Sequence, residues 1–173
     1  MSYLTPDAVP IGYSLTGRRS KKGYTKEKLV RFRGIPASKL SLPFLLLRYA
    51  FVDKSIALMT EGLGPRKFQG RTVVLVNEHS ASAAEMLAAF AMENRLATLV
   101  GVRTAGRLLS GTSFKVGKGY ILGLPVAGYF TWQGQLLEGK GISPDVLVEL
   151  SCEDLRQGRD TQMEKAIQVV KNM

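Results

Sequence analysis

One segment near the middle of this chain of 173 residues constrains its fold more than any other. Two apolar runs, RTVVLVN (71–77) and ATLVGV (97–102), flank an Ala-rich stretch with helical periodicity (82–95). Apolar strands joined by one helix form a right-handed parallel crossover unit, and strands of parallel sheets are buried on both faces. The sequence therefore predicts an α/β fold in which both apolar runs are buried strands.

The overall composition is that of one globular domain. Hydrophobic residues make up 45% of the chain and charged residues 22%, and the length suits a single domain at 1–173. One Cys and one His are present, so we expect no disulfide framework and no His-rich metal site. No cofactor is expected either. The longest apolar stretch, 42–52, is broken by Arg48 and is shorter than the roughly 18 residues of a membrane span.

Charge divides the chain into two parts. Residues 1–70 hold 13 Lys/Arg and 4 Asp/Glu, whereas residues 71–173 hold 11 and 10. In the basic run 17–34, Tyr24 and Phe32 interleave with the positive charges, a pattern that nucleic-acid-binding surfaces also show. Because no recognised nucleic-acid motif accompanies it, a solvated basic surface is the favoured interpretation and nucleic-acid binding the less favoured one.

Weaker signals predict the elements on the N-terminal side. Strands are expected at 9–15 and 28–34, separated by a basic turn, and the second alternates in polarity like a half-buried strand. A short helix is expected at 42–51, and 61–70 is a connection rich in Gly and Pro. The first ten residues lack the basic-then-apolar order of a signal peptide, and the compartment stays open.

On the C-terminal side, the segments SFKV, YILGLPV and GYFTW, with turn signals between them, predict antiparallel strands. A Gly- and Pro-rich loop then leads into another strand within 138–150. The chain closes with a predicted helix capped by Asp160 or Thr161, and the apolar side chains of this helix share one face (Met163, Ile167 and Val170).

The junction after the first apolar run carries two predictions at once. Ser82 and Glu85 form the S-x-x-E pattern of a capping box, in which the Ser side chain accepts from the Glu amide and the Glu side chain reaches back. The small neighbours Ala81, Ala83 and Ala84 leave space around the Ser82 hydroxyl. A helix N-terminus also offers free amides for an oxyanion, so Ser82 is a candidate nucleophile as well as a cap.

Three stretches resemble one known family. NEHSASAAEMLAAFAMENRLATLVGVRTAG (77–106) resembles the active-site segment of the C-terminal processing (tail-specific) serine peptidases. LLEGKGISPDVLVEL (136–150) is similar to their Glu-Gly-x-Gly-(Val/Ile)-x-Pro-Asp signature, and DTQMEKAIQVV (160–170) to their terminal helix. The resemblance implies a Clp/crotonase-like ββα superhelix, present here as a partial peptidase domain, with a nucleophile-bearing core at 71–173 and a basic strand and loop region at 1–70.

The same resemblance implies a chemistry and a set of residues. The substrate would be a peptide or protein, cleaved through an acyl-enzyme at Ser82, and the amide of Ala83 would help to form the oxyanion hole. The chain is closer to the branch of tricorn cores and retinoid-binding-protein-like modules than to the Ser–Lys branch. In the tricorn-like branch a Glu that orients the base falls on Glu138, although a turn carboxylate beside Lys140 is the plainer interpretation of that residue.

The general base is left open. The Ser–Lys branch keeps a Lys 25 positions after its Ser, but residue 107 here is Arg107, which stays protonated. Lys118 and Lys140 fall elsewhere in the pattern and are expected in solvated turns. The only histidine, His79, lies three residues before the candidate nucleophile and is a candidate base, with an exposed or capping residue as the alternative.

The family also has an Asp-x-Arg-x-Asn-x-Gly-Gly segment, whose glycine supplies the second oxyanion amide, before the region that MSYLTPDAVPIGYS (1–14) resembles. We therefore expect this chain to be N-terminally incomplete. Two functions follow as alternatives, a serine peptidase core or a non-catalytic assembly and binding module on the same scaffold. Exposed strand edges favour association into a homo-oligomer in either case.

Overall fold

The computed structural model describes residues 1–33, 43 and 55–173. The helix predicted at 42–51 therefore lies almost entirely outside the described residues. In the described part there are short 3-10 turns at Ser2–Leu4, Lys26–Lys28 and Gly64–Arg66. The other elements, in chain order, are β1 (Pro10–Thr16), α1 (Gly17–Lys22), β2 (Val30–Phe32), β3 (Ile56–Met59), β4 (Val73–Val76), α3 (Ala83–Glu93), β5 (Thr98–Gly101), β6 (Leu109–Gly117), β7 (Tyr120–Thr131), β8 (Val146–Leu147), α4 (Cys152–Arg156) and α5 (Thr161–Asn172).

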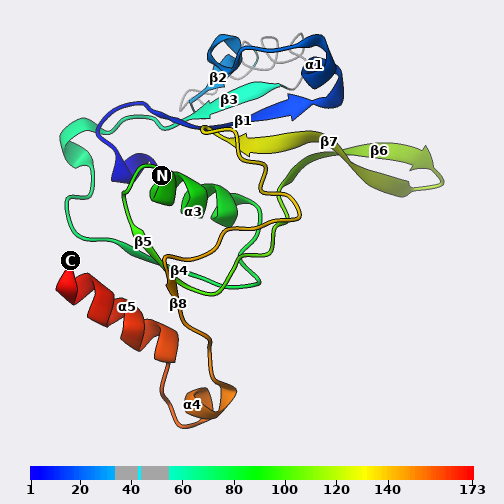
Figure 1. Ribbon diagram of the computed structural model, residues 1–173. Helices are drawn as coiled ribbons and strands as arrows, with labels where there is room; N and C mark the ends of the chain where they lie inside the picture. Colours follow the sequence, from blue (N-terminus) through cyan, green and yellow to red (C-terminus); the bar gives the residue numbers. More distant parts are fainter. Residues whose placement is uncertain (34–42, 44–54) are drawn as a thin grey trace.

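Two sheets enclose helix α3 (Figure 1). The larger sheet has the strand order β2-β3-β1-β7-β6 and the smaller one the order β4-β5-β8. Helix α3 contacts β1 and β7 of the larger sheet and β5 of the smaller one, and α5 contacts β4 and β5. None of the helices within the described ranges is long and apolar enough to cross a bilayer.

The predicted strand–helix–strand unit is confirmed. Strand β4 pairs in parallel with β5, and α3 connects them. Leu99 and Val100 of β5 are fully buried. The prediction that the first strand is buried on both faces is wrong, because Leu75 of β4 is 38% exposed. Strand β4 is the edge of its sheet, so its side chains have neighbours on one flank only.

The basic N-terminal region is more structured than the predicted turn. Strands β1 and β2 are present, and β2 pairs in parallel with β3. Between them the chain forms α1 instead of a simple turn. The Thr16 hydroxyl caps this helix by accepting from the Arg19 amide at 3.3 Å, and Gly23 ends it with a positive φ of 84°.

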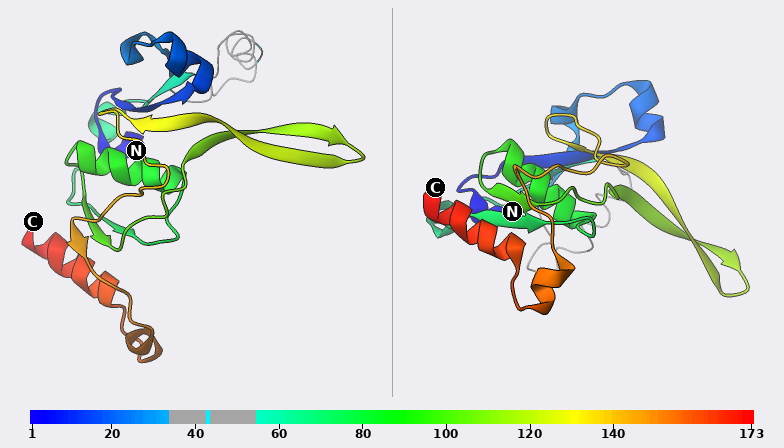
Figure 2. Two further views of the ribbon diagram at one scale, coloured as in Figure 1. Left: turned by 45° about the vertical axis from the view of Figure 1, so that its right-hand side comes forward. Right: turned by 60° about the horizontal axis from the view of Figure 1, so that its bottom comes forward.

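Strands β6 and β7 form one long antiparallel ribbon, and its outer half projects from the body of the molecule (Figures 1 and 2). The segments YILGLPV and GYFTW, predicted as separate strands, are one strand that runs through Pro125. This proline lies opposite Gly111, next to a shift in the register. A proline has no N–H to donate, and a bulge tolerates it because the ladder is interrupted there.

The C-terminal elements follow the prediction with one difference. Strand β8 pairs in parallel with β5, and Asp160 caps α5 by accepting from the Met163 amide at 2.9 Å. The side of α5 that carries Met163 and Ile167 is exposed, whereas Gln162 and Ala166 are buried. The polar Gln162 side chain can be buried because its amide nitrogen donates to the Val148 carbonyl at 2.8 Å.

A substitution of Gly101, at the end of β5, tests the close approach of strands β4 and β5. Its φ is +134°, and a Cβ there would lie 1.9 Å from the Val76 carbonyl oxygen. We predict that Gly101→Ala lowers the free energy of unfolding by about 2–4 kcal/mol, measured as a lower midpoint in urea. Gly123→Ala is the control, because a Cβ added there would meet no atom within 4 Å. Equal midpoints for the two variants would contradict the packing described for β4 and β5.

Candidate active site

Ser82 occupies the sharp turn between β4 and α3. Its backbone angles are φ 53° and ψ −119°, a combination that residues other than glycine rarely adopt. Such a conformation costs about 1–3 kcal/mol and persists where the surrounding structure enforces it, most often at functional sites. The turn leaves Ser82 exposed at the start of the helix, which is the geometry of a nucleophile on a strand–turn–helix elbow.

The two serines of this turn use their hydroxyls differently. Ser80 Oγ donates to the Asn77 side-chain oxygen at 3.1 Å and accepts from the Asn77 amide at 3.0 Å. Ser82 and Glu85 form the predicted capping box with both halves present, because the Ser82 side chain faces the Glu85 amide and the Glu85 carboxylate faces the Ser82 amide. The Ser82 hydroxyl itself donates to no acceptor among the described residues. The Ser82 hydroxyl is therefore the one left available for chemistry.

The first turn of α3 leaves one amide free. The amide of Ala84 donates to the Ala81 carbonyl, and the amides of Glu85 and Met86 both donate to the Ser82 carbonyl. The amide of Ala83 donates to no acceptor among the residues that the structure describes. This free N–H lies directly after Ser82 at the positive end of the helix dipole, where it can stabilise an anion.

Glu85 ties the serine turn to the loop that follows β5. Its carboxylate is 0% exposed and accepts from Thr104 Oγ1 at 2.6 Å and from the amides of Gly106 and Arg107 at 2.7 and 2.9 Å. It also accepts from the Ser82 amide at 3.3 Å, so the reaching-back half of the predicted capping box is present. A buried carboxylate with four donors is satisfied, and it fixes the position of each donor.

The same loop is joined to the segment that carries Glu138. The amide of Ile142 donates to Thr104 Oγ1 at 2.8 Å, and the amide of Gly139 donates to the Gly106 carbonyl at 2.8 Å. The two loops cross so closely that a Cβ on Gly141 would lie 2.3 Å from the Thr104 carbonyl oxygen. Glycines at this crossing are therefore required by the contact itself.

An apolar cavity opens beside Ser82, between α3 and the larger sheet. Its volume is about 530 Å³, and it is lined by Ser14, Ile56, Leu58, Ser82, Met86, Leu108, Leu109, Ser110 and Tyr129. Ser14 Oγ and Ser110 Oγ lie 3.1 Å apart and satisfy each other. Burial, reinforced by the charge of Glu93, raises the pKa of the Tyr129 hydroxyl above its ordinary value of 10.0, so this group stays neutral at physiological pH.

Glu138 lies on the other side of Leu109 from Ser82. Its carboxylate accepts from the Leu108 amide at 2.6 Å, and it lines a second cavity of about 420 Å³ that Leu109 also lines. Among the described residues, the ion pairs do not include one between Glu138 and Lys140. The structure thus places the predicted nucleophile and the predicted orienting carboxylate on two cavities that meet at Leu109.

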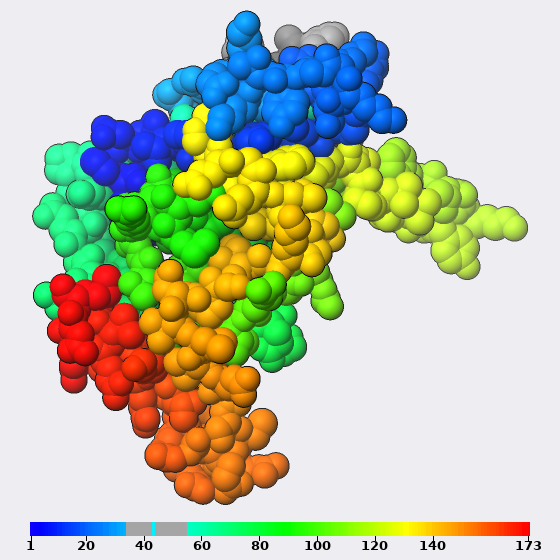
Figure 3. Space-filling view, in the orientation of Figure 1, coloured from blue at the N-terminus to red at the C-terminus, as the bar shows by residue number. Residues whose placement is uncertain are grey.

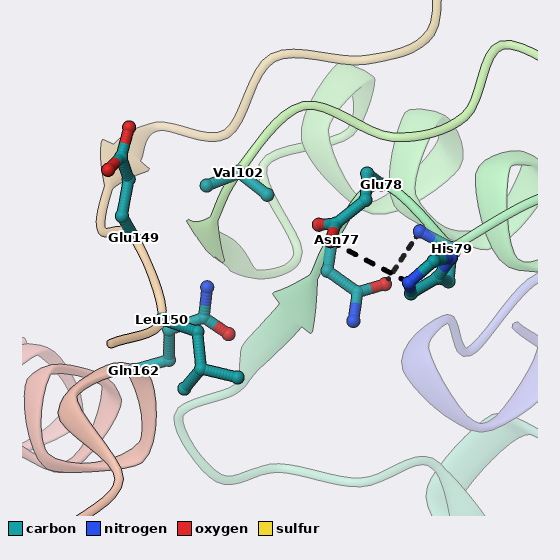
Figure 4. Close-up of a pocket in the computed structure, with 7 residues that line it drawn as sticks. All are labelled: Asn77, Glu78, His79, Val102, Glu149, Leu150 and Gln162. Atoms are coloured by element: carbon teal, nitrogen blue, oxygen red, sulfur yellow. Dashed lines mark hydrogen bonds and ion pairs between the residues drawn. The ribbon is translucent and has the colours of Figure 1, made fainter. Parts of the chain in front are cut away.

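His79 is not brought to the Ser82 cavity. Its side chain is 85% exposed and lies 3.7 Å from the Glu78 carboxylate, in a separate pocket that also includes Asn77, Glu149 and Gln162 (Figure 4). Its amide donates to the Asn77 side-chain oxygen at 3.0 Å, which fits the alternative of a turn residue. The role of His79 as a base stays a prediction without support from this geometry.

Arg107, Lys118 and Lys140 do not line the Ser82 cavity either. Arg107 has an exposed side chain and enters the site only through its amide. Lys118 lies in the exposed turn between β6 and β7, with a positive φ of 48°. Lys140 is exposed, and its carbonyl accepts from Arg103 at 3.4 Å.

Sequence reasoning missed the central position of Glu85, which it treated only as a capping partner. A capping box uses one carboxylate oxygen for one amide, but here two oxygens receive four donors. A signal was present in Thr104 and Gly106, because a hydroxyl and a glycine after the second strand can both approach the helix N-terminus. The pattern alone could not show that they converge on one carboxylate.

The sequence profile of peptidase family S41 matches residues 13–148 of this chain. The chain belongs to this family. Carboxy-terminal processing protease CtpA of Bacillus subtilis is 40% identical over 144 residues, 77% of this chain and 30% of that protein. A carboxyl-terminal-processing protease of Synechocystis sp. is 31% identical over 140 residues, 79% of this chain and 33% of that protein. Tricorn protease of Thermoplasma volcanium is 28% identical over 144 residues, 82% and 14% of the two chains.

Solved structures agree with the fold at lower identity. Mature CPAF has a TM-score of 0.62 at 15% identity, over 99% of this chain and 40% of that chain. The tricorn protease has a TM-score of 0.55 at 21% identity, over 81% and 14%. The predicted α/β peptidase fold is therefore confirmed, and the family supports a serine peptidase core over the non-catalytic alternative. The chain spans about a third of the length of the processing proteases it matches.

The Glu85 network can be tested by an isosteric change. Each carboxylate oxygen of Glu85 accepts from two donors. In Glu85→Gln an NH₂ group, which is itself a donor, replaces one of these oxygens. Two buried donors would then lose their acceptor, so we predict a loss of about 2–4 kcal/mol in the free energy of unfolding. Glu61→Gln, at an exposed position, is the control. A Glu85→Gln variant as stable as this control would show that the network carries no stability.

Proposed function

We propose that this chain is the core of a serine-type peptidase of the C-terminal processing kind, with Ser82 as the nucleophile. The observation that carries the proposal is the strained backbone of Ser82, φ 53° and ψ −119°, at the start of a helix whose next amide is free. A merely structural cap gains nothing from this strain. The family and its processing-protease relatives point to the same chemistry.

The residues divide the reaction between them. Ser82 Oγ attacks the carbonyl carbon of the scissile peptide, and its proton passes to a general base. The negative charge that develops on the carbonyl oxygen is stabilised by the Ala83 amide and the helix dipole. The base returns that proton to the leaving amine as the C–N bond breaks, which leaves an acyl-enzyme ester on Ser82. Water, deprotonated by the same base, then attacks the ester carbonyl. The bond to Ser82 Oγ breaks, the serine takes the proton back, and the acid product is released.

Glu138 is proposed as the residue that orients the base. Its carboxylate accepts from the amide of Leu108, a residue that lines the Ser82 cavity, and it lines the second cavity, which shares Leu109 with the first. Within the described part of the chain, the lining of the Ser82 cavity contains no His, Lys, Asp or Glu. The base is therefore not assigned to a residue of that lining.

The cavity also suggests the substrate side chain. Its lining is apolar apart from two serines that bond to each other, the candidate nucleophile and the neutral Tyr129. An unpaired charge buried there would lose its hydration without gaining a partner. We therefore propose that the peptide presents an uncharged, apolar residue at the scissile bond.

A serine-directed fluorophosphonate probe tests the assignment of the nucleophile. We predict that the probe labels the folded chain at Ser82, located by mass spectrometry of the digested adduct, and that Ser82→Ala abolishes labelling. Ser110→Ala is the matched control, because this serine lines the same cavity and its hydroxyl is already bonded. It should be labelled as the parent chain is.

Absence of labelling in a folded sample at high probe concentration would overturn the proposal. Labelling that survives Ser82→Ala, or that Ser110→Ala removes, would move the nucleophile elsewhere. Circular dichroism of each variant establishes that the sample is folded.

We further propose that the chain associates into a homo-oligomer through the projecting β6–β7 ribbon. Phe114 pairs with Leu122 across the two strands, so the alternation of side chains places four exposed apolar residues on one face. These are Phe114, Tyr120, Leu122 and Leu124. A two-stranded ribbon is marginally stable alone in water, and packing against the same face of a second copy would bury this apolar surface.

The oligomer prediction is tested by two single substitutions that add the same charge. Leu122→Lys places the charge on the apolar face and is expected to lower the mass measured by light scattering after size exclusion. Ile121→Lys changes the other face, since Ile121 pairs with Lys115, and should leave the mass of the parent chain unchanged. A parent chain that is monomeric at all concentrations would contradict the proposal.

A further inference from the structure

The most strongly charged surface of the described chain lies outside the machinery assigned above. Between Gly17 and Arg33 there are eight Lys/Arg residues and one acidic residue, Glu27. Helix α1 alone presents four exposed basic side chains, Arg18, Arg19, Lys21 and Lys22. Like charges three and four positions apart on a helix repel one another, although three of these four lie in the last turn, where the helix dipole favours positive charge.

These charges have no carboxylate partner among the described residues. The ion pairs in that part of the chain are His79–Glu78, Arg156–Glu153 and Arg159–Asp154, and all of them involve other elements. Contacts between Lys26 and Trp132 nevertheless fix the position of this basic segment. Lys26 Nζ donates to the Trp132 carbonyl at 2.7 Å and lies 4.7 Å from the centre of the indole ring.

Helix α1 forms one wall of the second cavity. Thr16, Gly17 and Ser20 line this cavity of about 420 Å³ together with Leu15, Pro125, Val126, Phe130 and Glu138. Thr16 pairs with Ala127 of β7, and Leu109 of β6 pairs with the next residue, Gly128. The groove therefore crosses β7, with α1 on one side and Glu138 on the other. Figure 3 shows the blue N-terminal segment directly above the yellow surface of β7.

This groove meets the Ser82 cavity at the edge of the larger sheet. The strand pairing places Leu15 and Phe130 of the groove on the opposite sheet face from Ser14 and Tyr129 of the Ser82 cavity. Leu109 lines both cavities, and Glu138 bonds to the amide just before it. Because Leu109 begins the edge strand β6, a peptide held by Ser82 at its scissile bond can pass round the sheet edge at Leu109, lie on the apolar floor of the groove and end beside the basic helix. The carboxylate of Glu138 lines the groove, and Gly17 and Ser20 of the basic helix α1 line its far wall.

We propose that this groove selects peptide substrates that carry acidic side chains beyond the residue at the scissile bond, and that the basic residues of α1 bind those side chains. The inference rests on the proposed function, because it assigns the substrate class of the same site. A peptide fits better than a nucleic acid because the floor between the two ends is apolar and includes Leu15, Pro125 and Val126. A polyanion without apolar groups could bind the basic residues of α1, but it would leave the apolar floor of the groove exposed to water.

The test measures binding, not turnover. Fluorescence anisotropy is recorded with the full chain carrying Ser82→Ala and two labelled peptides that share an apolar centre. One peptide has Asp and Glu in its flank, and the other has Ser and Gln at the same positions. We expect the acidic peptide to bind about tenfold more tightly, the effect of a few exposed ion pairs, and this preference to fall with rising salt.

Two variants of equal net charge locate the binding site. R18Q/R19Q/K21Q/K22Q removes four positive charges from α1, and K115Q/K118Q/K165Q/K171Q removes four from exposed positions on the ribbon and α5. The first variant should lose the preference for the acidic peptide, and the second should keep it. Circular dichroism establishes that both are folded.

Loss of the preference in both variants, or in neither, would overturn the inference, because the effect would then follow net charge or another surface. An unlabelled single-stranded oligonucleotide that displaces the acidic peptide at lower concentration than a matching unlabelled peptide would overturn it in favour of nucleic-acid binding. A failure of the proposed function is detected by a different experiment, the fluorophosphonate labelling, in which the chain that retains Ser82 would not be labelled.

Discussion

The buried carboxylate of Glu85 holds the candidate site together. It is fully enclosed and accepts from the hydroxyl of Thr104 and from the amides of Gly106, Arg107 and Ser82. A carboxylate without such donors could not be buried, and the donors could not be placed so closely without it. Removing any one element from this arrangement would leave a buried polar group unsatisfied, so the serine turn and the following loop form one unit.

The strain at Ser82 is understandable in this setting. A backbone in this region costs about 1–3 kcal/mol, and hydrogen bonds to a charged acceptor contribute about 1.5–3 kcal/mol each. The bonds of Glu85, together with the bond from the Ser82 amide to the Arg107 carbonyl at 3.1 Å, therefore offset the strain. The result is an exposed hydroxyl beside a free amide, fixed by groups that do not take part in the chemistry themselves.

The sequence predicted the parts of this arrangement that depend on local pattern. The parallel unit of β4, α3 and β5 follows from apolar runs and helical periodicity, and Ser82 follows from its place at the helix start. Other parts depend on which strands become neighbours. Leu75 is exposed because β4 is an edge strand, and β7 runs through Pro125 because a register shift accommodates it. The convergence of Thr104 and Gly106 on Glu85 likewise needs the tertiary contact.

The most direct test of the central claim is hydrogen exchange at three backbone amides of the native chain, followed by NMR. If Glu85 clamps the loop and leaves the oxyanion donor open, the amides of Gly106 and Arg107 exchange slowly and the amide of Ala83 exchanges rapidly. Rapid exchange at Gly106 and Arg107, at a rate like that of Ala83, would contradict the account, because the carboxylate would then hold neither the loop nor the serine turn.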